Sequence, residues 1–114
     1  MNTQLGRQTR FIARLIDIIA GVAVPDQIIL FGARAAGNSR SDGDYDFLVV
    51  VPYVENERNL SRRIYYALAE HHIDVPLHIL AVDRDTLDRH RDTPGMIYHQ
   101  VLTESIVCFD RRAA

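Results

Sequence analysis

The sequence predicts a small α/β (α+β) domain in which a small mixed sheet is flanked by helices. In two long segments, apolar residues recur at three- and four-residue steps, which is the period of an amphipathic helix. Short apolar runs rich in β-branched residues and bounded by Gly or Pro alternate with these segments, and such runs are typical of buried strands. The order helix, strand, loop, strand, helix, strand favours layers packed on one core.

The first half of the chain contains one expected helix and two expected strands. A helix is expected over residues 7–22, because its apolar residues share one face, and Pro25 follows it. Residues 28–31 form an apolar run that Gly32 closes, and residues 45–51 form a second run that ends before Pro52, so both are expected to be buried strands. A polar loop over residues 33–43 joins the two strands.

The second half repeats the pattern with shorter elements. Residues 56–70 are expected to form an amphipathic helix, and residues 73–82 a third strand whose first half lies at an edge or a bulge because of Pro76. Two short helices and a last edge strand are expected over residues 83–90, 94–102 and 105–109. Residues 111–114 are expected to fray.

Length and charge limit the classes of function. The chain has 114 residues, a mass of 13.0 kDa and 47% hydrophobic residues, so we expect residues 1–114 to form a single domain with one core. The net charge of −2 argues against direct nucleic-acid binding through a basic face, so any phosphate must be held by a local device. No apolar run is long enough for a membrane helix, and the single Cys108 forms no intramolecular disulfide, so a cytoplasmic location is expected.

Asp44 and Asp46 stand at the start of the second expected strand. Alternate residues of a strand point to the same face, so both carboxylates project together from Cα atoms about 7 Å apart. Two like charges repel unless cations neutralise them, and carboxylate and phosphate oxygens are the ligands that Mg²⁺ prefers. The alternative is a simple polar turn before the strand. A calcium loop is disfavoured, because Phe47 stands where such a loop needs Gly and Tyr53 where it needs Glu.

Gly32 ends the first expected strand and offers a complementary device. A strand that ends in Gly turns tightly and brings unhindered N–H groups toward an anion, and a helical turn beginning near Ala33 would add its dipole. Arg34 and Arg40 would add positive charge. A plain Gly turn remains the alternative for Gly32 alone. The combination is more specific, because it places a phosphate cradle and a metal site on adjacent strands.

This segment resembles the minimal nucleotidyltransferases of the polymerase-β superfamily, of the type that act as antitoxins. Their signature is Gly-Ser, ten residues and Asp-x-Asp, and this chain has Gly32-Ala33, ten residues, Asp44 and Asp46 at the same spacing. Arg34, Ala35 and Gly37 also match, as do the patterns over residues 75–80, 83–95 and 106–109, so the resemblance covers roughly residues 7–110. It implies the polymerase-β-like nucleotidyltransferase fold.

The resemblance also implies roles for individual residues. Asp44 and Asp46 would hold Mg²⁺ or Mn²⁺ on ATP or another nucleoside triphosphate, and a hydroxyl would attack the α-phosphate and release pyrophosphate. Gly32, with the backbone around Ala33 and Arg34, would form the phosphate cradle. His78 matches the third catalytic carboxylate of the family, which helps to deprotonate the attacking hydroxyl.

The chain departs from the family pattern at two of these positions. Ala33 replaces Ser, which removes one hydrogen bond worth about 0.5–1.5 kcal/mol. His78 replaces an acid, and this departure is the more serious one, because a general base contributes roughly 10²–10⁴ in rate and neutral imidazole is a poor Mg²⁺ ligand. His78 as a base and His78 as a structural residue both stay open. Asp74 is too far along the strand, about 13 Å, to replace it.

Three hypotheses from different classes follow. The first is a transferase that moves AMP from ATP to a partner protein, for which the resemblance implies a helical HEPN-type toxin. The second is a catalytically weakened nucleotide-binding subunit that neutralises such a partner by binding alone. The third, a purely structural domain, leaves Asp44 and Asp46 unexplained. A homo-oligomer is a further open alternative.

Overall fold

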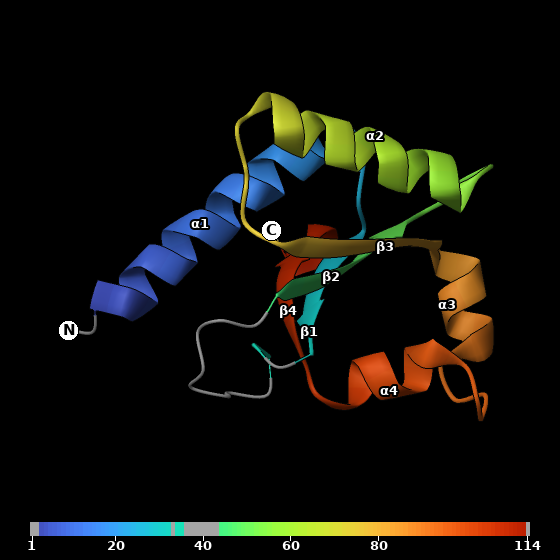
Figure 1. The fold of residues 1–114 in the computed structure, drawn as a ribbon. Coiled ribbons are helices and arrows are strands. Elements are labelled where there is room, and N and C mark those ends of the chain that lie inside the picture. Colours follow the sequence, from blue (N-terminus) through green and yellow to red (C-terminus); the bar gives the residue numbers. More distant parts are fainter. Residues whose placement is uncertain (1–2, 33, 36–43, 114) are drawn as a thin grey trace.

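The structure is a computed structural model that describes residues 3–32, 34–35 and 44–113, with side chains from residue 9 to residue 112 within these ranges. Its centre is a four-stranded sheet in the order β3-β2-β1-β4 (Figure 1). The strands are β1 (Gln27–Phe31), β2 (Tyr45–Val51), β3 (Leu77–Asp83) and β4 (Ser105–Asp110). β1 runs antiparallel to β2 and β4, whereas β2 and β3 are parallel, so the sheet is mixed. The predicted fold class is confirmed.

Helices cover both faces of this sheet (Figure 1). Side chains of α1 (Thr3–Ala20) and α2 (Glu57–Glu70) build a core on one face. Side chains of α3 (Arg84–His90) and α4 (Ile97–Thr103) build a smaller core on the other face. A short 3₁₀ helix, Arg111–Ala113, follows β4. Across the described ranges, no helix combines the length and the apolar character that crossing a membrane requires.

The central strand β2 contributes to both cores. Its residues from Phe47 to Val51 are all buried, and side chains alternate between the two faces of a strand. Phe47, Val49 and Val51 therefore pack against α1 and α2, whereas Leu48 and Val50 pack toward α3 and α4. Full burial of one such side chain contributes about 1.5–3 kcal/mol. The position of β2 is thus set from both sides.

Several expected boundaries are wrong. α1 spans Thr3–Ala20 rather than residues 7–22. β3 begins at Leu77 rather than at residue 73, because Pro76 has no N–H to donate to a ladder; its carbonyl instead accepts a hydrogen bond of 3.2 Å from the Tyr45 N–H. α4 begins at Ile97, after Gly95 turns the chain with a φ of +83°. Arg111 is not frayed, since its guanidinium lies 2.5 Å from Asp26 Oδ1.

Glu57, in the first turn of α2, carries a carboxylate oxygen that is poorly solvated. Its Oε2 atom is buried and makes no hydrogen bond within the part of the chain that the structure describes. Burial raises the pKa of Glu57 above its ordinary 4.5, and the nearby Asp83 carboxylate raises it further, although a backbone hydrogen bond from Asp83 acts in the opposite direction. The folded state therefore holds this proton more tightly than the unfolded state, and the unfolding free energy decreases as the pH rises from 4.5 through the raised pKa.

We expect Glu57→Gln to stabilise the protein at neutral pH and to have little effect below pH 4.5, where Glu57 is protonated in both states. The gain in melting temperature should be a few degrees at most, because electrostatic terms at a partly solvated site rarely exceed about 1 kcal/mol. Thermal unfolding between pH 4 and pH 8 measures it. Glu55→Gln, at an exposed position two residues earlier, is the matched control. An equal gain for both variants would contradict the assignment.

Candidate functional site

The candidate site lies at the end of the sheet that α3 and α4 leave open. On this face, β2 presents Val50 and Leu48, which are buried, and then Asp46 and Asp44. β3 contributes Val82 to the same core. Near the beginning of this strand lies His78, whose side chain is 67% exposed. On this face, the side chains of each strand are therefore apolar beneath α3 and α4 and polar beyond these helices.

Asp44, Asp46 and His78 come together at this open end. The parallel register of β2 and β3 places His78 directly beside Asp46. The imidazole lies between the two carboxylates, with Nδ1 at 3.0 Å from Asp46 Oδ1 and Nε2 at 3.4 Å from Asp44 Oδ2. Neutral imidazole has one N–H and can donate to one carboxylate, whereas imidazolium donates to both. The ring thus acts as a bridge between the two acids.

The three side chains differ in their exposure to solvent. Asp46 is the most shielded, with 22% of its side chain exposed, compared with 42% for Asp44 and 67% for His78. The attraction within the cluster is therefore screened by water and salt. The most exposed member is His78, so it is the side chain with the most freedom to rotate away and open the space between the carboxylates.

Gly32 brings backbone close to the Asp46 carboxylate. Its φ is +78°, and a Cβ built there would collide with Asp46 Oδ2. Both facts require glycine, because other residues rarely adopt this φ and a side chain would displace the carboxylate. The Ala35 N–H donates to the Gly32 carbonyl at 3.1 Å and closes a turn. The predicted role of Ala33 and the rest of the loop, residues 36–43, lie outside the described residues.

Arg34 lies at the same end of β2 as the carboxylates. Its guanidinium carbon is 3.8 Å from the centre of the Tyr45 ring, a cation–π arrangement. Tyr45 is buried and its ring packs 5.0 Å from that of Phe11 on α1. Stacking on Tyr45 therefore anchors Arg34 beside the strand segment that carries Asp44 and Asp46.

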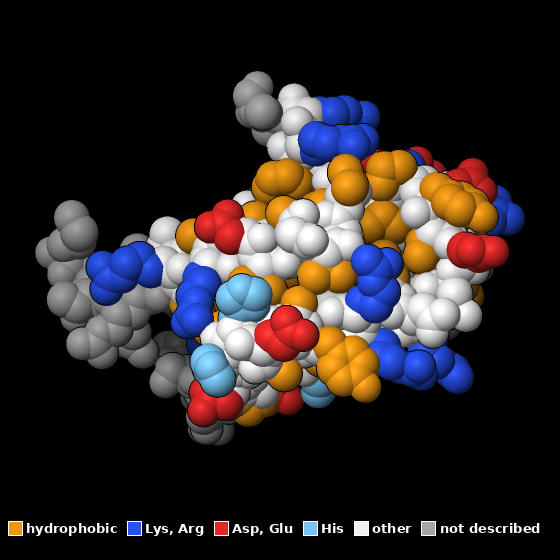
Figure 2. All heavy atoms as spheres, turned by 90° about the horizontal axis from the view of Figure 1, so that it is seen from above, with side chains coloured by type: hydrophobic (Ala, Val, Ile, Leu, Met, Phe, Trp, Pro, Cys, Tyr) orange, Lys and Arg blue, Asp and Glu red, His pale blue; other side chains and the backbone are white. Residues whose placement is uncertain are grey.

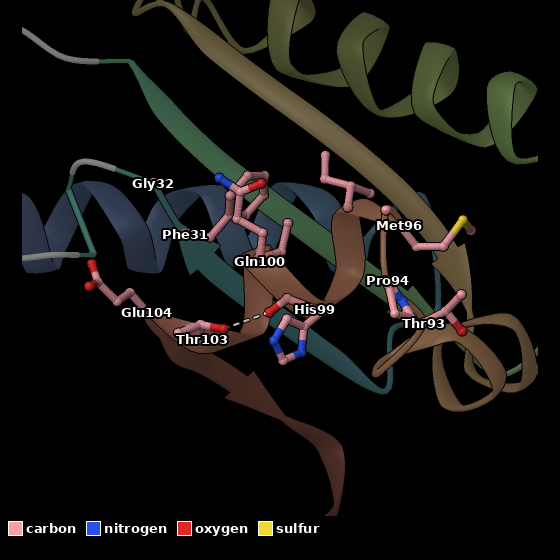
Figure 3. A pocket seen from close by; sticks show the side chains of 12 residues that line it. Phe31, Gly32, Thr93, Pro94, Met96, His99, Gln100, Thr103 and Glu104 are labelled. Atoms are coloured by element: carbon pink, nitrogen blue, oxygen red, sulfur yellow. Dashed lines mark hydrogen bonds between the residues drawn. The ribbon is translucent and has the colours of Figure 1, made fainter.

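An open groove of about 1020 Å³ begins at Gly32 and runs along α4 (Figure 3). Phe31 and Gly32 form one end, and the remaining lining comes from residues 93–104, including Met96, Ile97 and Gln100. Sequence reasoning missed this groove, because nothing in the pattern of residues 93–104 indicates that α4 packs next to the end of β1. The one signal in this segment was the run Thr93-Pro94-Gly95, which indicates a turn before the following helix.

The two carboxylates fit a metal ion only if other ligands complete its shell. Within the described ranges, no three His, Cys, Asp or Glu side chains are arranged to hold a metal ion. Asp44 and Asp46 nevertheless converge within reach of one imidazole, and Gly32 leaves the space beside Asp46 free of a Cβ. Carboxylate oxygens suit Mg²⁺, which usually keeps few protein ligands and takes the rest from phosphate and water. The residues therefore fit Mg²⁺ bound together with a phosphate group.

The other histidines lie apart from the cluster. His71 ends α2, where its ring Nδ1 is 2.8 Å from the Ala67 carbonyl, and His72 follows with a φ of 59°. His99 on α4 lies 3.8 Å from the Asp92 carboxylate. These are surface and cap positions.

Comparisons with known proteins support the fold. A scan against protein-family models finds no match, and a search of curated proteins finds none either. Among solved structures, one described as a toxin–antitoxin with AMP-PNP superposes with a TM-score of 0.55. The alignment covers 90% of this chain and 75% of that chain at 18% sequence identity. At this identity the likeness establishes a shared fold.

We expect Gly32→Ala to destabilise the protein more than Gly95→Ala. Both glycines have a φ near +80°, so both variants carry the same backbone strain of about 1–2 kcal/mol. Only at Gly32 does the added Cβ also meet a carboxylate, whereas nothing lies within 4 Å of the Cβ position at Gly95. Urea unfolding of the two variants measures the difference. Equal losses would show that Gly32 is not held against Asp46.

Proposed function

We propose that this chain binds a nucleoside triphosphate and works as a nucleotidyltransferase in a toxin–antitoxin pair, where it transfers AMP from ATP to its protein partner. The observation that carries the proposal is the convergence of Asp44 and Asp46 beside the bare backbone of Gly32. The resemblance of the Gly32–Asp46 segment to minimal nucleotidyltransferases supports it. So does the shared fold with a structure described as a toxin–antitoxin with AMP-PNP.

In this proposal the triphosphate lies at the open end of the sheet. Gly32 and the following backbone, including Ala33 and Arg34, bind phosphate oxygens through N–H groups. The absence of a Cβ at Gly32 lets the Asp46 carboxylate lie directly against this backbone, so the metal site and the phosphate site adjoin. Asp44 and Asp46 hold Mg²⁺ or Mn²⁺, which supplies charge neutralisation for the triphosphate. The exposed His78 moves out from between the carboxylates when they are engaged in this way.

The proposed reaction is an in-line displacement. A hydroxyl oxygen of the partner forms a bond to the α-phosphorus, and the bond from that phosphorus to the bridging oxygen of the β-phosphate breaks. Pyrophosphate leaves with the electron pair, and the hydroxyl proton passes to an imidazole nitrogen of His78. The register of β3, which sets His78 directly beside Asp46, supports this proposed role.

A protein acceptor suits the surface of the molecule. The α2 side of the molecule carries hydrophobic side chains and arginines together (Figure 2). Tyr65 and Tyr66 are exposed there, and Arg58 and Arg62 line the same shallow hollow on α2. Tyrosine and arginine are enriched at protein interfaces. A helical protein of the HEPN type is the partner that we propose.

The second candidate is a nucleotide-binding subunit that neutralises its partner without catalysis. The observation that favours it is the engagement of both His78 nitrogens with the carboxylates. A general base needs a nitrogen that is free to accept a proton. A carboxylate at the position of His78 could contribute to the metal site, which neutral imidazole does poorly for Mg²⁺. The two candidates share the nucleotide site and differ only in the role of His78.

We expect ATP binding to require Mg²⁺ or Mn²⁺ and to be lost in the Asp44→Asn/Asp46→Asn double variant, because the amides cannot hold the cation. Titration calorimetry with and without EDTA measures both effects. Asp74→Asn, at an exposed position before β3, is the control and should bind as the wild type does. Metal-independent binding that survives the double substitution would refute the proposed site.

His78 variants separate the transferase from the silent binder. If His78 is the base, His78→Ala should lose roughly 10²–10⁴ in transfer rate and still bind ATP. If catalysis has been lost with the third carboxylate, the wild type should be inert and His78→Asp should create AMP transfer. Labelled ATP with the purified chain and its partner measures transfer. Strong wild-type labelling that His78→Ala leaves unchanged would exclude both roles.

A further inference from the structure

The groove along α4 is continuous with the proposed phosphate site. Gly32 lines the end of the groove and also lies against the Asp46 carboxylate, so one residue borders both spaces. The groove has a volume of about 1020 Å³, which is at the upper end of the range for small-molecule sites. A ligand whose phosphates lie beside Gly32 and Asp46 would therefore reach the groove at the Gly32 end.

The walls of the groove combine apolar side chains with polar ones, the latter including His99, Gln100 and Glu104. Phe31 contributes an aromatic ring at the Gly32 end, and Met96 and Ile97 are 38% and 49% exposed at the beginning of α4. Large apolar side chains that face solvent on a concave surface gain free energy when a flat apolar group covers them. The groove is therefore suited to an aromatic group.

Gln100 supplies an unused polar group. Figure 3 shows it rising from α4 toward Phe31 and Gly32. Its side-chain amide makes no hydrogen bond within the part of the chain that the structure describes, whereas the neighbouring Thr103 hydroxyl donates to the His99 carbonyl at 2.8 Å. One carboxamide presents a donor and an acceptor side by side, which is the pattern that pairs with N6 and N7 of adenine.

We propose that this groove binds the base of the nucleotide and that Gln100 selects adenine. The proposal rests on the proposed function, which places the triphosphate at Gly32, Asp44 and Asp46. The base lies between Phe31 and the start of α4, and the Gln100 amide accepts from the N6 amino group and donates to N7. Guanine presents an acceptor at the corresponding O6, so it leaves the Gln100 carbonyl oxygen without a donor.

The test compares nucleotides with a probe that has no base. Binding of ATP, GTP, CTP and inorganic tripolyphosphate to the full chain is measured by calorimetry with Mg²⁺, for the wild type and for Gln100→Leu. We expect the wild type to prefer ATP, and Gln100→Leu to bind ATP about tenfold more weakly with tripolyphosphate unchanged. Met96→Ser should weaken all three nucleotides and leave tripolyphosphate unchanged. Arg89→Leu, an exposed polar-to-leucine change on α3 outside the groove, is the matched control.

Three results would overturn the proposal, and they are distinguishable. Binding that needs Asp44 and Asp46 but is equal for ATP and tripolyphosphate would leave the phosphate site standing and remove the base from the groove. Unchanged ATP affinity in Gln100→Leu and Met96→Ser with loss of partner labelling would assign the groove to the acceptor instead. Failure of the wild type to bind either ATP or tripolyphosphate would remove the proposed function and this inference together.

Discussion

β2 is buried on both faces over five consecutive residues, and the rest of the structure depends on this constraint. A slip of one residue in its pairing would exchange the side chains that face the two cores, so the register with β1 and β3 is strongly specified. The same alternation that places Leu48 and Val50 under α3 and α4 places Asp46 and Asp44 beyond that cover. The location of the acids is thus a consequence of core packing.

The pairing of β3 with β2 determines which residue faces the acids. Parallel strands need a long connection, and here α2 provides it and packs on the α1 side. In this register His78 lies beside Asp46, where a carboxylate would add a third negative charge to the cluster. The His78 imidazole instead lies between the Asp44 and Asp46 carboxylates, at 3.4 Å and 3.0 Å. His78 is thus an internal partner for both acids.

Local patterns in the sequence predicted the elements well and tertiary contacts poorly. β2 follows from the apolar run over residues 47–51 that ends before Pro52. The projection of Asp44 and Asp46 toward one face follows from the two-residue period of a strand. The early start expected for the third strand failed because Pro76 interrupts the ladder. The contact of Arg111 with Asp26 joins residues 85 positions apart, and the packing of α4 beside Gly32 is equally remote in sequence. No local pattern encodes such contacts.

The exposure of the acidic cluster bears on how a nucleotide would gain affinity here. Asp44 and His78 are substantially exposed, and Asp46 is partly so, which means that water and salt screen charge interactions at the phosphate end. The groove offers apolar area and a free carboxamide on a separate part of the chain. In the proposed arrangement the phosphates contact the β1–β2 segment and the base contacts α4. The nucleotide would then join elements that are far apart in sequence, and its binding would tie the stability of α4 to the occupancy of the phosphate site.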